Sequence, residues 1–264
     1  MAVAVTAHGH VTNIVVNGVY YRNFLPNIDP YTQNPPKVMG WTAGNTDNGY
    51  IAPNNFQSPD IICHVSATPG KAHVAVRAGD SISIQWNTWP ESHHGPVIDY
   101  LARCNGTCET ADKNALKFFK IDGSGLVSGY NPGYWAADVL ISNAASWLVK
   151  IPEDIAPGNY VLRHEIIALH GAHEINAAQA YPQCFNLEIS GTGTSQPQLR
   201  AAIQVKRYRY KHRHSSHPDI SCTYEFYDLD LDLGPIHKFN FNVSWRVLAV
   251  YHHLYTVRIY HASR

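Results

Sequence analysis

Residues 15–20 read Val-Val-Asn-Gly-Val-Tyr, which places Asn-Gly between residues that favour β-strands. Asn-Gly accepts positive φ at both central positions of a tight turn, so this stretch predicts a β-hairpin. Residues 81–86 (Ser-Ile-Ser-Ile-Gln-Trp) alternate polar and apolar side chains, as a strand with one buried face does. The two stretches predict a protein built from half-buried strands.

Similar patterns continue to about residue 190. Further strands are expected at 72–77, 147–151, 160–163 and 184–189, with turns at 77–80 and 157–159. Helical periodicity appears only around 136–145. Many short strands separated by Gly/Pro turns predict an all-β fold, an antiparallel β-sandwich of the immunoglobulin or fibronectin kind with long loops and little helix.

Composition narrows the class of protein. The 264 residues are 45% hydrophobic and 15% charged, which excludes a coiled coil, a collagen and a wholly disordered chain. No apolar run approaches the ~18 residues of a membrane span, so no membrane partner is expected. A net charge of zero gives no general attraction to nucleic acid, and none is expected as a partner.

The charge and the turn residues divide the chain in two. Residues 1–199 carry 10 Lys+Arg against 15 Asp+Glu, whereas residues 200–264 carry 10 against 5. The first part holds 14 Pro and 17 Gly, and the second holds 2 and 1. We therefore expect one domain at 8–195 and an atypical basic, irregular extension at 196–264. Taken alone, its basic and aromatic run at 206–214 could bind nucleic acid or an anionic surface.

Four cysteines lie in the first part, and four allow three disulfide connectivities. Cys104 and Cys108 can close a small loop, which leaves Cys63 to join Cys184. A zinc site is the rival interpretation, although the sequence has only one close Cys pair. Asn105 opens an Asn-Gly-Thr glycosylation acceptor, which fits a secreted protein from an oxidising compartment.

Residues 1–7 are small and apolar, and they fit either an ordinary N-terminus or the remnant of a secretory signal peptide. Cleavage after Ala7 would make His8 the first residue. Its amine and its ring would then form a two-nitrogen chelate, and one further imidazole would complete a set that suits copper(II). His93, in a Pro- and Gly-bounded loop, is the candidate, although such a histidine is often only solvated. The peptide His8-Gly9-His10 could also bind copper by itself.

Several segments together resemble one family. They are His8–Val11, Asn34–Pro36, Pro59–His64, Ser92–Val97, Ala156–Tyr160, Arg163–His170 and Gln179–Cys184. In this order they are similar to the fungal lytic polysaccharide monooxygenases of auxiliary activity family 9, once classed as glycoside hydrolases. The resemblance runs from His8 to about Ile189.

The resemblance implies a role for particular residues. His8 and His93 would bind one copper ion, with Tyr181 in the axial position and His170 and Gln179 beside the metal. It also implies the disulfides Cys63–Cys184 and Cys104–Cys108, and it makes His94 the non-ligand of its pair. Tyr31 is a candidate for stacking on a sugar ring. The structural alternatives are a core aromatic for Tyr181, strand-end residues for His170 and Gln179, a turn aromatic for Tyr31, and surface charges for His164 and Glu165.

The activity that the resemblance implies is oxidative. A secreted, monomeric enzyme would cleave cellulose or a related β-1,4-glucan at C1 and/or C4, using O2 or H2O2. Electrons would come from a small reductant or cellobiose dehydrogenase. The sequence shows no recognisable pair of carboxylates for glycoside hydrolysis. A non-catalytic polysaccharide- or copper-binding protein and a true hydrolase are the alternative functions.

Overall fold

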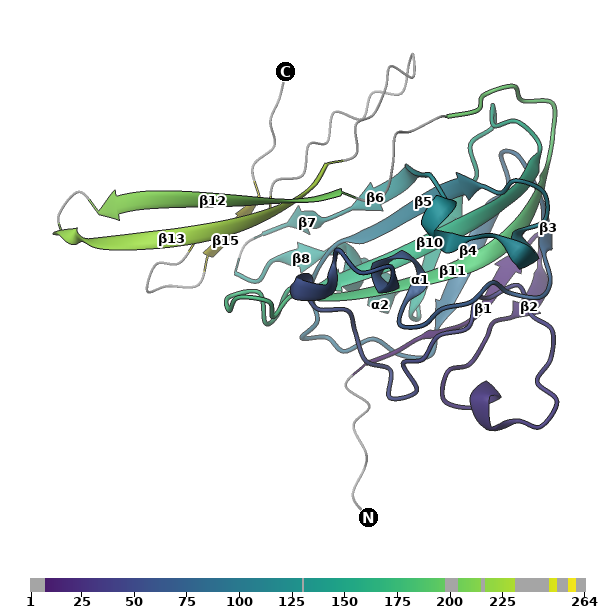
Figure 1. Ribbon diagram of the computed structural model, residues 1–264, viewed down its shortest axis with the longest axis horizontal. Helices are drawn as coiled ribbons and strands as arrows, with labels where there is room; N and C mark the ends of the chain where they lie inside the picture. The colour runs from purple at the N-terminus through teal and green to yellow at the C-terminus, as the bar shows by residue number, and fades with distance from the viewer. Residues whose placement is uncertain are drawn as a thin grey trace.

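The computed structural model describes residues 8–129 and 131–197 in full, together with the backbone of four strands beyond residue 203. Two sheets form the body of the molecule (Figure 1). The first has the order β2-β1-β4-β9, and the second has the order β3-β11-β10-β5-β6. The prediction of an all-β sandwich is confirmed by this arrangement.

The bounds of the elements are as follows. The four-stranded sheet contains β1 (Val11–Val16), β2 (Val19–Arg22), β4 (Ser81–Trp86) and β9 (Ser146–Lys150), and the five-stranded sheet contains β3 (Val74–Arg77), β5 (Val97–Arg103), β6 (Phe118–Ser124), β10 (Gly158–Ala168) and β11 (Gln179–Ser190). A small ribbon pairs β7 (Leu126–Ser128) with β8 (Tyr134–Trp135), and the helices are α1 (Asp60–Cys63) and α2 (Ala136–Ser142). Single 3₁₀ turns lie at Asp29–Tyr31, Pro53–Asn55, Cys108–Thr110 and Lys113–Ala115.

The predicted hairpin is present. Val16 pairs with Val19 across the turn, and Asn17 and Gly18 both have positive φ, at 50° and 79°. A type I′ turn requires this backbone, and its twist matches that of the strands it joins.

The connection at 78–80 differs from a hairpin because it passes between the sheets. The Ala78 N–H donates to the Ser190 carbonyl in the five-stranded sheet, while the Gly79 N–H donates to the Ile151 carbonyl just after β9. As a result β3 pairs with β11 in parallel, the one departure from antiparallel pairing within the two sheets. Alternation along one strand does not contain this information, because it specifies a buried face and not a neighbour.

The main core lies between the two sheets. Ile82 and Ile84 of β4 face Leu162 of β10 and Leu187 of β11 in one cluster of fully buried side chains. Burying each such side chain contributes about 1.5–3 kcal/mol. A second cluster on the other face of the five-stranded sheet includes Trp41, Tyr100 and Val161, so β10 is buried on both faces.

This double burial decides against one alternative that the sequence left open, namely surface charges at His164 and Glu165. Arg163, His164 and Glu165 are buried on β10 and are not surface charges. The Arg163 guanidinium donates to both oxygens of Glu165, at 2.9 and 2.6 Å, and to the carbonyls of Ile61 and Ile62. Burial of an ion pair is tolerated when the remaining donors are also satisfied, as they are here.

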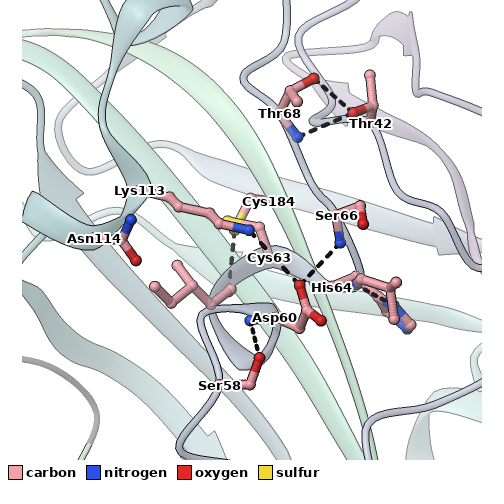
Figure 2. A network of polar contacts seen from close by, with 12 residues as sticks. Thr42, Ser58, Asp60, Cys63, His64, Ser66, Thr68, Lys113, Asn114 and Cys184 are labelled. Carbon is pink, nitrogen blue, oxygen red and sulfur yellow. Dashed lines mark hydrogen bonds and ion pairs between the residues drawn. A yellow bond between two sulfur atoms is a disulfide. The ribbon is translucent and has the colours of Figure 1, made fainter.

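Both disulfides that the resemblance implies are present. Cys63 at the end of α1 is bonded to Cys184 of β11, and Cys104 is bonded to Cys108. Figure 2 shows the first bond beside Asp60, whose carboxylate accepts from the Ser66 N–H and lies near Lys113. Because the four cysteines of residues 1–199 are all paired, the alternative of a zinc site at these cysteines is wrong.

The C-terminal part was expected to be irregular, but four strands occur there, in two antiparallel pairs. The backbone of β12 (Gln204–His214) pairs with β13 (His217–Asp230), and β14 (Val247–Val250) pairs with β15 (Thr256–Ile259). Long runs rich in β-formers pair through the backbone even without Gly or Pro between them. The side chains of the basic run at 206–214 lie outside the described residues, as does the remnant expected at 1–7.

No helix in the described part of the chain has both the length and the apolar character needed to cross a membrane.

Candidate metal centre

His8 is placed by the short segment that leads into β1. The His10 N–H donates to Asn87 Oδ1 at 2.8 Å, and the His10 carbonyl accepts from the Asn87 N–H. A Cβ on Gly9 would lie 2.0 Å from the Thr88 carbonyl oxygen, so only glycine allows this close approach. The segment is therefore held against the end of β4, and His8 lies at that end of the sandwich.

His93 lies in the loop between β4 and β5, which is fixed on both sides. The Leu169 N–H donates to the His94 carbonyl at 2.8 Å, and Trp89 Nε1 donates to the His93 carbonyl at 3.0 Å. Gly95 packs so closely on β10 that a Cβ would lie 1.9 Å from the Ile167 carbonyl oxygen. The loop thus holds His93 buried beside the end of β10.

The two histidines meet at this end of the molecule. Their ring centroids are 5.3 Å apart, and the Tyr181 ring lies 5.5 Å from the His8 ring. His170, just beyond β10, stacks on His93 with 3.8 Å between centroids. His8 and His93 are 85 positions apart in the chain. They are brought together because the start of β1, the loop after β4, and the Ala168–Gln179 end of the β10–β11 pair all lie at this end of the sandwich.

His93 has one nitrogen without a partner. Its Nδ1 lies 3.1 Å from Ser92 Oγ, whereas its Nε2 is buried and has no hydrogen-bond partner in the described part of the chain. Burial, with contributions from His170 and His8, lowers the pKa of His93 to about 4. The imidazole is therefore neutral near pH 7, and in the tautomer whose Nδ1–H donates a hydrogen bond to Ser92 Oγ the Nε2 lone pair is available to a metal.

Tyr181 and Gln179 act as a pair on β11. They lie two positions apart and so share one face of the strand. The Tyr181 hydroxyl donates to Gln179 Oε1 at 2.6 Å. Burial, then the neighbouring Tyr50, raises the pKa of Tyr181, so the phenol stays protonated at neutral pH.

His8 and His170 are also favoured in the neutral form. Burial lowers the pKa of His8, although the Asp47 carboxylate partly opposes this effect. Burial, with the nearby His8, His173 and His94 rings, lowers the pKa of His170. Neutral imidazoles are the form that binds metals.

Two contributors were missed by sequence reasoning. Tyr50 is partly exposed, and its ring lies 6.0 Å from those of both His8 and Tyr181. Trp89 packs edge-on against Tyr181 at 4.9 Å and against His93 at 5.9 Å. Trp89 lies in the loop that sequence analysis singled out, but nothing in the Gly49-Tyr50-Ile51 segment marks Tyr50 as a neighbour of the site.

The other candidate residues make no ring contact with this cluster in the described part of the chain. Tyr31 is 74% exposed in its 3₁₀ turn and makes no ring contact with the cluster among the described residues. Asn105 is exposed within the small disulfide loop. His94, expected to be the non-ligand, points its Nδ1 to Asp138 at 2.9 Å.

The donor set fits a metal only if residues 1–7 are removed. In the described residues no group of three or more His, Cys, Asp or Glu side chains could hold a metal ion. Two imidazoles alone are too few for such a group, and the α-amine of a processed His8 would supply the third nitrogen. The unpartnered Nε2 of His93 beside the His8 ring is consistent with copper.

Comparison with known proteins gives a consistent result. The model of Auxiliary Activity family 9 (formerly GH61) matches residues 8–227. The chain is 59% identical over 197 residues to the family 9 lytic polysaccharide monooxygenase cel61A of Hypocrea jecorina, and 62% identical to monooxygenase H of Thermothelomyces thermophilus. These alignments cover 75% and 74% of this chain and 57% of each relative, so the chain spans just over half of their length.

Solved structures agree with the sequence matches. The extended catalytic domain of H. jecorina LPMO9A superposes with a TM-score of 0.71 at 57% identity, covering 75% of this chain and 82% of that one. H. jecorina Cel61B, at 41% identity, gives 0.67 and covers 71% and 83%. The family match extends beyond residue 195 into β13, which the resemblance in the sequence did not reach. This chain belongs to Auxiliary Activity family 9.

Proposed function

We propose that this protein is a secreted, copper-dependent lytic polysaccharide monooxygenase that cleaves β-1,4-glucan, with cellulose as substrate, at C1 and/or C4. The observation that carries the proposal is the buried His93 Nε2, which has no hydrogen-bond partner among the described residues, in a ring whose centroid lies 5.3 Å from that of His8. Family membership supports the class of reaction. The two disulfides support secretion, because such bonds persist in oxidising compartments.

Removal of residues 1–7 is part of the proposal. The amine and ring of His8 and the Nε2 of His93 would hold one copper ion, with Tyr181 beside it. While residues 1–7 remain attached, the nitrogen of His8 is an amide and not an amine, and one ligand is lost. The proposed boundaries are a signal remnant at 1–7, the copper domain at 8–195 and a C-terminal extension at 196–264.

A copper ion held by these residues would supply one-electron chemistry for oxidising a sugar C–H bond with O2 or H2O2, with electrons from a small reductant or cellobiose dehydrogenase. The chain orients what lies around it. Gln179 Oε1 accepts a 2.6 Å hydrogen bond from the Tyr181 hydroxyl and so orients its O–H bond. His170 is stacked on His93 and exposed to solvent. Its ring can therefore donate a hydrogen bond or hold a proton on the solvent-exposed side of His93.

Exposed aromatics fit a polysaccharide surface. Tyr31 and Tyr50 present ring area to solvent, and aromatic rings stack on the apolar faces of sugars. We propose Tyr31 as a substrate contact away from the metal, and a monomer that acts on a chain or crystal face.

The test is mass spectrometry of the products released from cellulose by the processed protein, with and without ascorbate and a copper chelator. Oxidised oligosaccharides that require reductant and disappear with chelator are expected. Absence of any product, with binding retained, would favour a non-catalytic binding protein. Unoxidised sugars released in the presence of chelator would favour a hydrolase. Either outcome contradicts the proposal.

A further inference from the structure

His10 is a competitor for the copper ion of the proposed site, because it lies two residues after His8. In the processed chain four nitrogens could surround one copper(II) ion in a plane: the α-amine of His8, the amide nitrogens of Gly9 and His10, and Nδ1 of the His10 ring. The ion would displace the two amide protons to solvent. This tripeptide chelate and the site with His93 need the same α-amine, so one ion can occupy only one of them.

The amide nitrogen of His10 is turned away from such a chelate. Its N–H donates to Asn87 Oδ1 at 2.8 Å, and the His10 carbonyl accepts from the Asn87 N–H at 3.0 Å. A metal bound to an amide nitrogen takes the place of the amide proton, and here that proton points at the Asn87 oxygen. Loss of the proton would also leave an anionic nitrogen against an acceptor oxygen, so the hydrogen bond would become a repulsion. Asn87 therefore opposes the tripeptide chelate.

The ring of His10 is held by a different residue. Its Nδ1 lies 2.8 Å from Asn48 Oδ1, and both side chains are buried. Of the two ring nitrogens, only Nδ1 can close a six-membered chelate ring with the amide nitrogen of the same residue. The ring also lines a small cavity together with Trp41 and Gln183. The two donors that His10 would give to the chelate are thus bonded to two different residues.

Asn48 is fixed in place by the loop that carries it. Before it, the Gly44 N–H donates to the Val65 carbonyl at 2.8 Å. After it, Ile51 and Ala180 of β11 exchange two backbone hydrogen bonds, at 2.9 and 3.0 Å. Asn48 has a φ of 59°, a left-handed backbone that asparagine tolerates better than most residues. Because the loop is bonded on both sides of Asn48, it cannot follow a histidine ring that turns toward a metal.

We propose that Asn48 and Asn87 are positioning residues that keep His10 away from the metal, so that copper is bound by His8 and His93 and not by the tripeptide chelate. This inference rests on the proposed function, since it requires a free amine at His8. It also has a consequence for reactivity. An ion with four nitrogens in its plane has no open position there for an oxidant, whereas three nitrogens leave one.

The first test measures copper(II) affinity by calorimetry in the full processed chain carrying His93→Ala, where the competing imidazole is absent. Asn87→Ala and Asn48→Gly should each raise the affinity about tenfold, because each removes one bond that must break before the tripeptide chelate forms. Glycine accepts the positive φ at position 48. Asn45→Gly is the matched control, because Asn45 is buried in the same loop and makes no hydrogen bond to His10 in the described part of the chain.

The gain in affinity should vanish when His10→Gln is added, since glutamine supplies no imidazole. Unchanged affinity in the two variants, an equal gain in Asn45→Gly, or a gain that survives His10→Gln would overturn the inference. Tryptophan fluorescence must show that each variant is folded, because unfolding would also free the tripeptide. Asn87 is exposed, so Asn87→Ala decides the question if Asn48→Gly does not fold. If His93→Ala alone leaves the affinity of the parent unchanged, the proposed function fails, while the comparison among the asparagine variants still judges this inference.

The second test uses the metal-free protein. Hydrogen exchange at the His10 amide, followed by NMR, should be at least about tenfold slower than in a synthetic peptide of residues 8–11, because the N–H is bonded to Asn87. Asn87→Ala should remove most of this protection. Exchange in the parent at the rate of the peptide would show that the amide is free to bind a metal, and the inference would then be wrong.

Discussion

His93 and His164 are both buried imidazoles, but they belong to opposite kinds of site. His164 Nε2 accepts from Trp86 Nε1 at 3.0 Å, and its Nδ1 lies 2.8 Å from Asp99 Oδ1. Asp99 Oδ2 is itself bonded to Trp147 Nε1. His93 has only Ser92, and its Nε2 has no partner in the described residues. A histidine with both nitrogens engaged stabilises the interior, whereas one with a free nitrogen is available for chemistry.

The largest effect on stability is expected from His164→Ala. The variant leaves the Trp86 N–H and one Asp99 oxygen without partners and opens a cavity, so the free energy of unfolding should fall by about 3–5 kcal/mol. Urea unfolding followed by tryptophan fluorescence measures this loss. Trp86→Phe removes only one of the two bonds and should cost less. Equal stability of His164→Ala and the parent would contradict the comparison.

The next effect is on copper binding, in His93→Ala. Loss of the free Nε2 should weaken copper(II) affinity at least ~100-fold, with little change in the free energy of unfolding. Calorimetry gives the affinity, and the paramagnetic spectrum shows whether His8-Gly9-His10 has taken over the ion. His64→Gln is the control, because His64 is also a buried histidine but makes no ring contact with the His8 cluster among the described residues. Unchanged affinity in His93→Ala, or a loss as large in the control, would show that the free nitrogen is not the ligand.

His64 supplies a prediction about pH. Burial lowers the pKa of His64 from 6.5 to about 4. Between these values the unfolded chain binds a proton at this residue and the folded chain does not, so stability falls as the pH drops from about 6.5 to 4. The parent should lose on the order of 3 kcal/mol more than His64→Gln over this window. Denaturant titrations of both proteins at several pH values measure the difference, and parallel curves would contradict it.

The smallest effect is expected at Tyr31, which makes no ring contact with the histidine cluster among the described residues. Tyr31→Ala should weaken binding to cellulose roughly two- to tenfold, because one stacking ring is lost. Copper affinity should stay the same, since Tyr31 lies outside the ring contacts of the cluster. Leu148→Ala, which removes an exposed apolar side chain from β9, is the control. A pull-down assay on cellulose measures both, and equal binding of the two variants would remove Tyr31 from the substrate face.

Local sequence was sufficient for the regular elements. The Asn17-Gly18 turn and the bounds of β4 follow from positive-φ residues and a period of two, which are properties of neighbouring residues. The ordered segments of the family pattern identified His8, His93, His170, Gln179 and Tyr181 as candidates, and the structure brings these five together. Their roles toward copper and substrate stay predictions.

Tertiary structure determined which strands pair with each other and which distant residues surround each side chain. A strand pattern gives one buried face but does not say which sheet receives β3 and β4, and it does not reveal that β10 is covered on both faces. For that reason the burial of His164 and Glu165, the place of Tyr50, and the single free nitrogen of His93 were not visible in the chain. Each depends on which distant residues surround a side chain, and that is set when the two sheets pack and exclude water.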